Sequence, residues 1–194
     1  MEKLIDKMRK NKVVVDNLKT ISKVCPVKRI QLFNSEITII VKTDDILNVL
    51  LFFKNNYLCQ FKVLSCLSGV DHPKSPYRFT VVYDLLSIRY NNRFKVKVFT
   101  YELGEVPSSV NLYSAADWFE CEIWDMFGVF FKDHPNLKRI LTDYGFQGYP
   151  LRKDFPLTGF IEMRYNESNK RVMNEAIELS QEYRTFNFSS TWEY

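Results

Sequence analysis

The sequence has few residues that could bind a metal ion or an iron–sulfur cluster. Its 194 residues include four cysteines and two histidines. Metal and cluster sites need clustered thiolates or a set of cysteines and histidines, but no C-x-x-C occurs, and the closest cysteines, Cys59 and Cys66, are seven positions apart. We therefore expect no metal in this chain, and we interpret the cysteines as small buried residues in a reducing compartment.

Motifs that bind nucleotides are also missing. Neither G-x-G-x-x-G nor G-x-x-x-x-G-K-[ST] occurs, and the glycines of Tyr144–Tyr149 are better interpreted as turn residues than as a phosphate loop. The chain is therefore not expected to bind NADH itself. Neither His72 nor His134 has a triad partner that the sequence identifies. The longest apolar run, Val49–Phe53, is far shorter than the ~20 residues that span a bilayer, so no direct membrane span is expected.

The net charge of +4 comes from the N-terminal end of the sequence. Residues 1–28 contain eight Lys or Arg and three acidic residues, a net charge of +5. A mitochondrial transit peptide or a nucleic-acid-binding arm could have such a charge, but transit peptides are rich in Arg and poor in acids, whereas this segment has Arg9 alone. We favour a solvated helix that packs Leu4, Ile5 and Met8 on the body of the protein.

Alternating and β-rich runs predict a mixed domain over residues 1–131. The runs Lys28–Phe33 and Ile37–Val41 are predicted to pair through a turn at Asn34-Ser35-Glu36. A second hairpin is predicted around Asn91-Asn92, between 78–90 and 93–101, because asparagine tolerates positive φ. A strand is expected at Phe61–Leu67, ended by Ser68-Gly69. A helix capped by Thr43 or Asp44 is expected before it, with its apolar residues on one face: Ile46, Leu47, Leu50, Leu51 and Phe53. Two more helices are expected, one from near Ser108 or Ser109 and one from Ala115 to Phe127, which Gly128 stops. This order predicts an α+β fold, with helices packed on a largely antiparallel sheet.

Residues 132–194 are predicted to form a long irregular tail. Glycine and proline interrupt this segment, and one short helix is predicted at about Lys170–Glu182. The tail nevertheless carries eleven aromatic residues, from Tyr144 to Tyr194. Leaving so many rings in water would expose more apolar surface than soluble monomers normally tolerate. We therefore interpret 132–194 as an extended segment that binds partner proteins, the preceding domain, or both.

Two groups of charged residues could carry chemistry. Glu122 and Asp125 lie three positions apart on a predicted helix and share a face with Trp118, but acids on helix faces are usually solvated or paired with cations. The runs Lys138-Arg139 and Arg152-Lys153-Asp154 could contact phosphates of RNA or lipid. Acidic residues interrupt the positive charge there, so salt bridges to a partner protein are the favoured interpretation.

A long stretch near the C-terminal end resembles the signature of the thirty-kilodalton subunit of respiratory complex I, which is called NADH dehydrogenase subunit nine when organelle-encoded and has bacterial counterparts. It is Trp118–Pro156, WFECEIWDMFGVFFKDHPNLKRILTDYGFQGYPLRKDFP. The family typically has E-R-E-x-W-D-[ML]-[FY]-G-[VI], then H-P, R-R-[IL]-L and T-D-Y-G-F-x-G-H-P-L-R-K-D-[FL]-P. Three positions depart from this pattern: Cys121 replaces an arginine, Gln147 an acid and Tyr149 a histidine. Losing the arginine removes a bidentate clamp for a carboxylate.

The resemblance implies a structural subunit without catalytic residues, in the quinone-facing peripheral arm of NADH:ubiquinone oxidoreductase. There it would support electron transfer from NADH to ubiquinone, coupled to proton translocation. The resemblance implies that iron–sulfur clusters, FMN and ubiquinone are bound by neighbouring subunits, especially the cluster-bearing and quinone-pocket subunits. It also implies an interface with those partners, for which the sequence offers Glu122, Trp124, Asp125, His134, Arg139, Asp143, Tyr144, Phe146, Arg152, Lys153, Asp154 and Trp192.

The expected location is the matrix side of the mitochondrial inner membrane, and the protein is expected to be encoded and synthesised inside the organelle. The segment 1–28 does not have the composition of a transit peptide, and the ending Trp192-Glu193 resembles organelle-encoded members. A bacterial source stays open. Three other functions stay open as well: a sheet domain that binds RNA, an independent oxidoreductase, and the equivalent subunit of a membrane-bound hydrogenase. The small net charge and the missing nucleotide motif make the first two the weaker alternatives, and no nucleic acid is expected as a partner.

Overall fold

The computed structural model describes residues 23–33 and 36–184, and the chain divides into two compact units. Unit 1 runs to Asp154, and unit 2 begins at Phe155. The predicted boundary lies after residue 131, so the first part of the predicted tail, 132–154, belongs to unit 1. The predicted N-terminal helix, the turn at Asn34-Ser35 and Trp192 lie outside the described residues.

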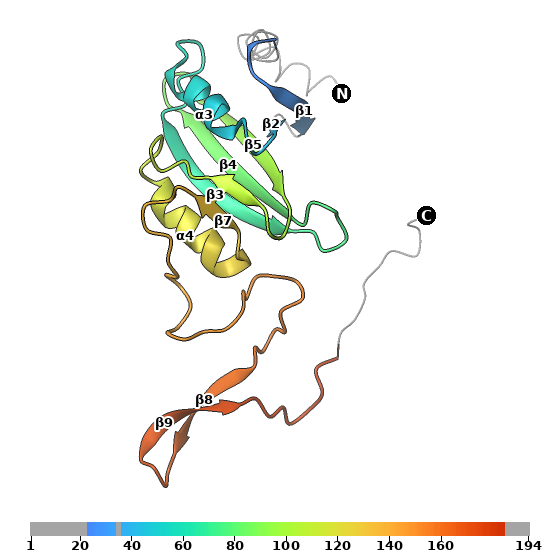
Figure 1. The fold of residues 1–194 in the computed structure, drawn as a ribbon, viewed down its shortest axis with the longest axis vertical. Coiled ribbons are helices and arrows are strands. Elements are labelled where there is room, and N and C mark those ends of the chain that lie inside the picture. Colours follow the sequence, from blue (N-terminus) through green and yellow to red (C-terminus); the bar gives the residue numbers. More distant parts are fainter. Residues whose placement is uncertain (1–22, 34–35, 185–194) are drawn as a thin grey trace, which may run out of the picture. The chain divides into compact units, whose positions relative to one another are not determined.

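Unit 1 is built on a five-stranded sheet with the order β1-β2-β5-β4-β3 (Figure 1). The strands are β1 (Val27–Phe33), β2 (Glu36–Val41), β3 (Val63–Asp71), β4 (Phe79–Ser87) and β5 (Asn92–Thr100). Within this sheet β2 and β5 are parallel, and the other three pairs are antiparallel. The predicted α+β class and the largely antiparallel sheet are therefore confirmed.

The alternation of apolar and polar residues decides which face of the sheet is buried. In β5, Phe94, Val96 and Val98 are buried, while the residues between them are half-buried. The register places Val96 opposite Ile39 of β2 on one side and Tyr83 of β4 on the other. Residues that are directly opposite share a face, so three strands contribute to one core layer.

Both predicted pairs of antiparallel strands are present, β1 with β2 and β4 with β5, and one strand is longer than predicted. Asn91 has a φ of 48° in the tight connection between β4 and β5, as the sequence suggested. Strand β3 was expected to end at Ser68-Gly69, which is wrong. It continues to Asp71 because β4 pairs with it as far as Phe79.

Helix α3 (Ile46–Asn55) covers one part of the buried face. Its buried residues are Ile46, Val49, Leu50 and Phe53. The ring of Phe53 contacts the rings of Phe61 and Phe94. Leu51, predicted on the buried side, is 45% exposed, because it lies about 100° around the helix from Leu50. The predicted cap is also wrong, since the N-cap position is Asp45 and no side-chain hydrogen bond caps the helix.

Helix α4 (Ala116–Phe127) lies on the same face of the sheet as α3 (Figure 1). It ends, as predicted, at Gly128, which has a φ of 76°. The helix approaches β3 closely, because a Cβ atom at Gly69 would lie 2.7 Å from the ring of Phe127. The buried residues of α4 are Ala116, Glu120, Cys121, Ile123 and Asp125.

The residues around Ser108 and Ser109 form turns rather than the predicted helix. They follow β6 (Glu105–Pro107), which pairs in parallel with β7 (Phe130–Lys132). The backbone N–H of Ser108 donates to the carbonyl of Lys132, so the β7 pairing holds this segment extended. Among the described residues, no helix is long and apolar enough to cross a membrane.

Unit 2 contains one antiparallel hairpin, β8 (Ile161–Asn166) with β9 (Arg171–Ala176). The helix predicted at Lys170–Glu182 is therefore wrong. Strand β9 pairs with β8 along its whole length, and this pairing overrides the local helical pattern.

We expect Phe53→Ala to destabilise unit 1 far more than Leu51→Ala. Phe53 is fully buried against two other rings, and truncating such a residue costs about 3–5 kcal/mol. Leu51 lies on the same helix and is partly exposed, so its truncation should cost less than about 1.5 kcal/mol. Urea unfolding followed by circular dichroism measures both. Equal losses for the two variants would contradict the described packing of α3.

Candidate functional site

The most diagnostic part of the sequence folds back onto the end of helix α4. Asp125 is fully buried and accepts hydrogen bonds from the backbone N–H groups of Ile140, Leu141 and Thr142 at 3.2, 2.8 and 2.9 Å. The hydroxyl of Thr142 donates to its other oxygen at 2.6 Å. The guanidinium of Arg139 lies 3.5 Å from the same oxygen. A single carboxylate therefore fixes the whole segment 139–142.

The pKa of Asp125 reflects this arrangement. Burial by itself would raise the pKa, but the Thr142 hydroxyl and the three backbone N–H groups together lower it below its ordinary value. The charged form is thus the stable one. Because its lone pairs are occupied by these donors, Asp125 has little capacity left to accept a proton from a substrate.

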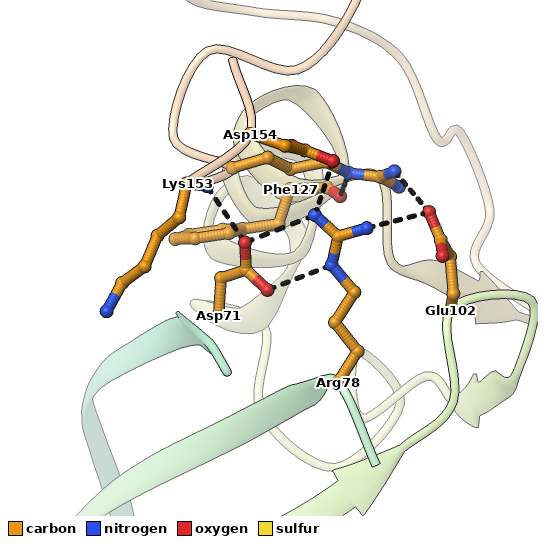
Figure 2. A network of polar contacts seen from close by, with 7 residues as sticks. Asp71, Arg78, Glu102, Phe127, Lys153 and Asp154 are labelled. Atoms are coloured by element: carbon orange, nitrogen blue, oxygen red, sulfur yellow. Dashed lines mark hydrogen bonds and ion pairs between the residues drawn. The ribbon is translucent and has the colours of Figure 1, made fainter. Parts of the chain in front are cut away.

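A second cluster, which we call the arginine network, consists of Asp71, Arg78, Glu102, Arg152 and Asp154. Figure 2 shows the Arg78 guanidinium between three carboxylates. It donates to Asp71 through Nε at 3.0 Å and through Nη2 at 3.3 Å. It also contacts Glu102 at 3.0 Å and Asp154 at 2.8 Å. These residues come from strand β3, the start of β4, the β5–β6 loop and the end of unit 1.

Arg152 joins the same network from the most diagnostic motif. Its Nε donates to the carbonyl of Phe127 at 2.7 Å, and its Nη1 donates to Glu102 at 2.8 Å. Its guanidinium also lies over the ring of Tyr149, 4.5 Å from the centroid. A Cβ atom at Gly128 would meet the Tyr149 ring at 2.6 Å and Arg152 at 2.8 Å, so the glycine makes this packing possible.

The carboxylate of Asp71 connects the network to the backbone. Its side chain is 1% exposed, and it accepts the backbone N–H of Lys153 at 2.9 Å. Burial would raise the pKa of Asp71, but Arg78 and the Lys153 N–H lower it below its ordinary value. Conversely, the pKa of Arg78 is raised by its bonds to Asp71 and Asp154. Removing one partner of such a pair leaves an uncompensated buried charge, which is strongly destabilising.

A third buried carboxylate, Glu120, is held by the turn after β6. It accepts from the hydroxyls of Ser108 and Ser109 at 2.6 and 2.7 Å, and from the Ser109 backbone N–H at 2.8 Å. Burial nevertheless raises its pKa, and this outweighs the lowering by the two serines and by His134. Glu120 therefore connects helix α4 to the segment where the sequence predicted a helix.

Asp117, Cys121 and His134 bring three potential metal ligands within 4.8 Å of one another. The imidazole Nε2 of His134 lies 3.3 Å from the Asp117 carboxylate and 3.9 Å from the Cys121 sulfur. However, its Nδ1 accepts the backbone N–H of Asn136 at 3.1 Å, so the proton of the neutral ring belongs on Nε2. A metal-bound histidine normally donates from its other nitrogen, so this arrangement favours a hydrogen-bonded cluster over a metal ligand set.

The structure separates the other predicted interface residues into two groups. Trp124 and Phe146 are half-buried, and the Trp124 ring contacts Phe130 and Tyr149. Glu122, Asp143 and Tyr144 are exposed. Glu122 and Asp125 therefore do not form a carboxylate pair with Trp118, because one acid is buried and the other faces solvent.

The three departures from the family pattern also differ in their surroundings. Cys121 is buried, and its sulfur lies 3.5 Å from the carbonyl of Asn136. Tyr149 packs between the guanidinium groups of Arg139 and Arg152. Gln147 is exposed. Cys121 thus contacts residues 134–136, and Tyr149 lies within the packing that holds segment 139–154.

Five acidic or basic residues of these clusters were not predicted from the sequence. They are Asp71, Arg78, Glu102, Asp117 and Glu120. The E-C-E motif contains both Glu120 and Glu122, but only Glu122 was predicted to be an interface residue. Asp71 and Arg78 are only seven positions apart, but the contacts that bring in Glu102, Arg152 and Lys153 span 24 to 82 positions, so no local spacing marks the network.

Comparisons with known proteins agree on one family. The family model described as "Respiratory-chain NADH dehydrogenase, 30 Kd subunit" matches residues 39–161. The NADH-ubiquinone oxidoreductase subunit 9 of Reclinomonas americana is 54% identical over 158 residues, which cover 81% of this chain and 78% of that protein. An NADH-quinone oxidoreductase subunit of Paramagnetospirillum magneticum is 52% identical, covering 81% and 79%. The mitochondrial NADH dehydrogenase [ubiquinone] iron-sulfur protein 3 of Candida albicans is 48% identical, covering 98% and 71%.

A solved structure shares the fold. It is a chain in the membrane-bound sulfane sulfur reductase, an archaeal respiratory membrane complex. The TM-score is 0.64 at 24% identity, over 76% of this chain and 86% of that chain. At this identity the similarity concerns the fold alone.

We expect Asp125→Asn to remove part of the acid sensitivity of unit 1. The folded-state pKa of Asp125 is lowered, so its stabilisation is complete above the unfolded value of about 3.9 and is lost as pH falls through the lower folded value. At pH 7 the variant should lose about 1.5–3 kcal/mol, the usual contribution of a hydrogen bond to a charged group. Below about pH 4 its deficit relative to the wild type should shrink.

Glu122→Gln, an exposed acid on the same helix, provides the matched control and should change stability by less than about 0.5 kcal/mol. Thermal unfolding at pH 7 and pH 3 measures both variants. A deficit for Asp125→Asn that is the same at both pH values would contradict the role assigned to its charge.

Proposed function

Because the chain belongs to the family of the 30-kDa subunit of respiratory-chain NADH dehydrogenase, we propose that it is a non-catalytic structural subunit of complex I. Its proposed place is the quinone-reducing module of the peripheral arm. There it holds neighbouring subunits together while electrons pass from NADH to ubiquinone and protons are translocated. FMN, iron–sulfur clusters and ubiquinone belong, in this proposal, to those neighbouring subunits.

The observation that carries this proposal is the two-sided hairpin of unit 2. The register puts Tyr165 opposite Val172 and Ile161 opposite Ala176 on one face, and Met163 lies between them. Ile161, Met163, Tyr165 and Val172 are each more than half exposed. We call this surface the apolar hairpin face.

The other side of the hairpin is mostly polar, and its one apolar residue, Met173, lies opposite Arg164. Glu162 lies opposite Glu175, and Arg171 lies opposite Asn166. Arg164 forms an ion pair with Glu175 at 3.8 Å. A ribbon with one charged and one apolar face fits a segment that places its apolar face on another protein and its charged face in water.

A hairpin of two strands is at best marginally stable by itself in water. Fully burying one large apolar side chain contributes about 1.5–3 kcal/mol, so covering the apolar hairpin face would offset much of the entropy lost on ordering. The described part of unit 2 has no buried residue to supply such a core. A partner surface is therefore the proposed source of its stability.

A structural role also fits the chemistry of the buried carboxylates in unit 1. Asp125, Asp71 and Glu120 all accept several hydrogen bonds from the chain itself. Acid or base catalysis needs a group that can exchange a proton with a substrate within hydrogen-bond reach. These three groups are instead occupied in holding segments of the chain together.

The proposed location is the matrix side of the mitochondrial inner membrane. Similar proteins include one whose name states a mitochondrial location and others from bacteria. A peripheral subunit needs no span of its own, which agrees with the helices of the described residues. Synthesis inside the organelle remains part of the proposal.

We expect Arg152→Glu to lower the amount of assembled complex more than the turnover of each assembled complex. The substitution places a carboxylate beside Glu102 and leaves the Phe127 carbonyl without its donor. Glu102 is 49% exposed, so solvent weakens this ion pair, and the expected cost of about 1–3 kcal/mol is that of leaving the Phe127 carbonyl unsatisfied. Native gels with activity staining measure both quantities.

Lys62→Glu, an exposed charge reversal elsewhere in unit 1, serves as control and should assemble normally. Normal assembly of Arg152→Glu with a collapsed turnover would refute the structural role, because it would place Arg152 in the quinone reaction itself.

In the isolated chain, the rate of amide hydrogen exchange should be low in unit 1 and high in unit 2. Amides of 37–100 in the sheet, and those of Ile140, Leu141 and Thr142, should be protected because they are hydrogen-bonded in unit 1. Amides of 155–184 should exchange rapidly in the isolated chain and slowly in the assembled complex. Slow exchange of β8 and β9 in the isolated chain would show that unit 2 is stable without a partner, against the proposal.

A further inference from the structure

A basic depression lies beside the arginine network. Its volume is about 660 Å³, and it is lined by His72, Pro73, Lys74, Ser75 and Lys153. We call it the basic crevice. Three of its five lining residues carry nitrogen bases, and none of the five is acidic.

The backbone on both sides of the basic crevice is fixed. The backbone N–H of Lys153 donates to the buried Asp71 carboxylate at 2.9 Å. On the opposite wall, His72 N–H donates to the carbonyl of Arg78 at 2.8 Å, and Ser75 N–H donates to the carbonyl of His72 at 3.0 Å. Both walls are therefore tied to the same pair, Asp71 and Arg78, which fixes the backbone from which Lys74 and Lys153 extend.

The side chain of Lys153 points away from the arginine network (Figure 2). The nearby carboxylates are engaged elsewhere, since Asp71 and Asp154 both contact Arg78 at 3.0 and 2.8 Å. Lys153 and Lys74 are exposed, and both face a depression whose lining offers them no counter-charge.

We infer that the basic crevice binds an acidic segment of a neighbouring polypeptide, with carboxylates on Lys74 and Lys153. This inference rests on the proposed function and names the partner chemistry at one surface of unit 1. Polybasic surfaces that bind anionic lipid generally present four to eight Lys or Arg over a broad area. Two lysines and one histidine around a concave site fit a short acidic peptide better, because charge complementarity fixes the register of protein partners.

Carbodiimide coupling of the assembled complex tests the inference directly. This reagent joins an amine to a carboxylate that it already contacts, so mass spectrometry should identify Lys74 or Lys153 linked to an Asp or Glu of another subunit. The chain supplies an internal positive control, because Lys95 and Glu36 are 2.5 Å apart and should couple within the chain. Recovery of the Lys95–Glu36 link without any link from Lys74 or Lys153 would overturn the inference while leaving membership of the complex untouched.

Charge reversal provides a second test of the inference. Lys74→Glu with Lys153→Glu should lower the amount of assembled complex about tenfold, which corresponds to about 1.4 kcal/mol. The pair Lys74→Arg with Lys153→Arg keeps both charges and should assemble normally. Lys42→Glu with Lys62→Glu reverses two exposed lysines elsewhere in unit 1 and should also assemble normally. Equal loss in both reversed pairs would attribute the effect to net charge and reject the crevice.

Vesicles distinguish the remaining ligand class. The isolated chain should float equally poorly with phosphatidylglycerol and with phosphatidylcholine vesicles at physiological salt. Selective binding to phosphatidylglycerol that Lys74→Glu with Lys153→Glu abolishes would assign the crevice to a lipid headgroup and reject the protein partner.

Discussion

The charge of Asp125 is the constraint on which the second half of unit 1 depends. A carboxylate without solvent contact must be surrounded by donors, and the donors here are three consecutive backbone N–H groups, one hydroxyl and one guanidinium. All of them come from 139–142. The chain that leaves strand β7 therefore has to return to helix α4. This requirement explains why residues 132–154 belong to the compact unit and do not form part of a separate tail.

The arginine network likewise holds the end of unit 1 in place through buried charges. Arg78 and Arg152 share Glu102, and Asp71 accepts both a guanidinium and the backbone of Lys153. Asp71, Arg78 and Arg152 have little exposure, and buried charges are stable only when their partners are present, so the loss of one of them affects the others. The glycine after α4 is part of this set, because its missing side chain leaves room for Tyr149 and Arg152. Most of the motif Trp118–Pro156 thus makes contacts within unit 1 that hold its segments together.

The large apolar side chains are mostly buried in unit 1 and exposed in unit 2. In unit 1 two helices cover one face of a sheet, and fully buried rings such as Phe53, Phe61 and Phe79 fill the space between them. In unit 2 the apolar side chains alternate along a ribbon and remain exposed. A rigid, internally braced unit followed by an amphipathic hairpin suits a subunit whose proposed task is to hold other subunits in place.

Local patterns in the sequence determined the strands of the five-stranded sheet, the helices α3 and α4, and the family. Alternation in β5, the asparagine turn at Asn91 and the glycine that ends α4 act over a few residues, so they can be read without knowing the fold. Tertiary structure alone decided which acid of α4 is buried, that 170–182 contains a strand, and which carboxylates Arg152 and Arg78 bind. The strand in 170–182 depends on its pairing with the neighbouring strand β8, whereas the buried acid and the arginine contacts depend on partners up to 82 positions away, as with Lys153 and Asp71. Spacing along the chain carries no information about such contacts, because they exist only after the sheet has brought distant segments together.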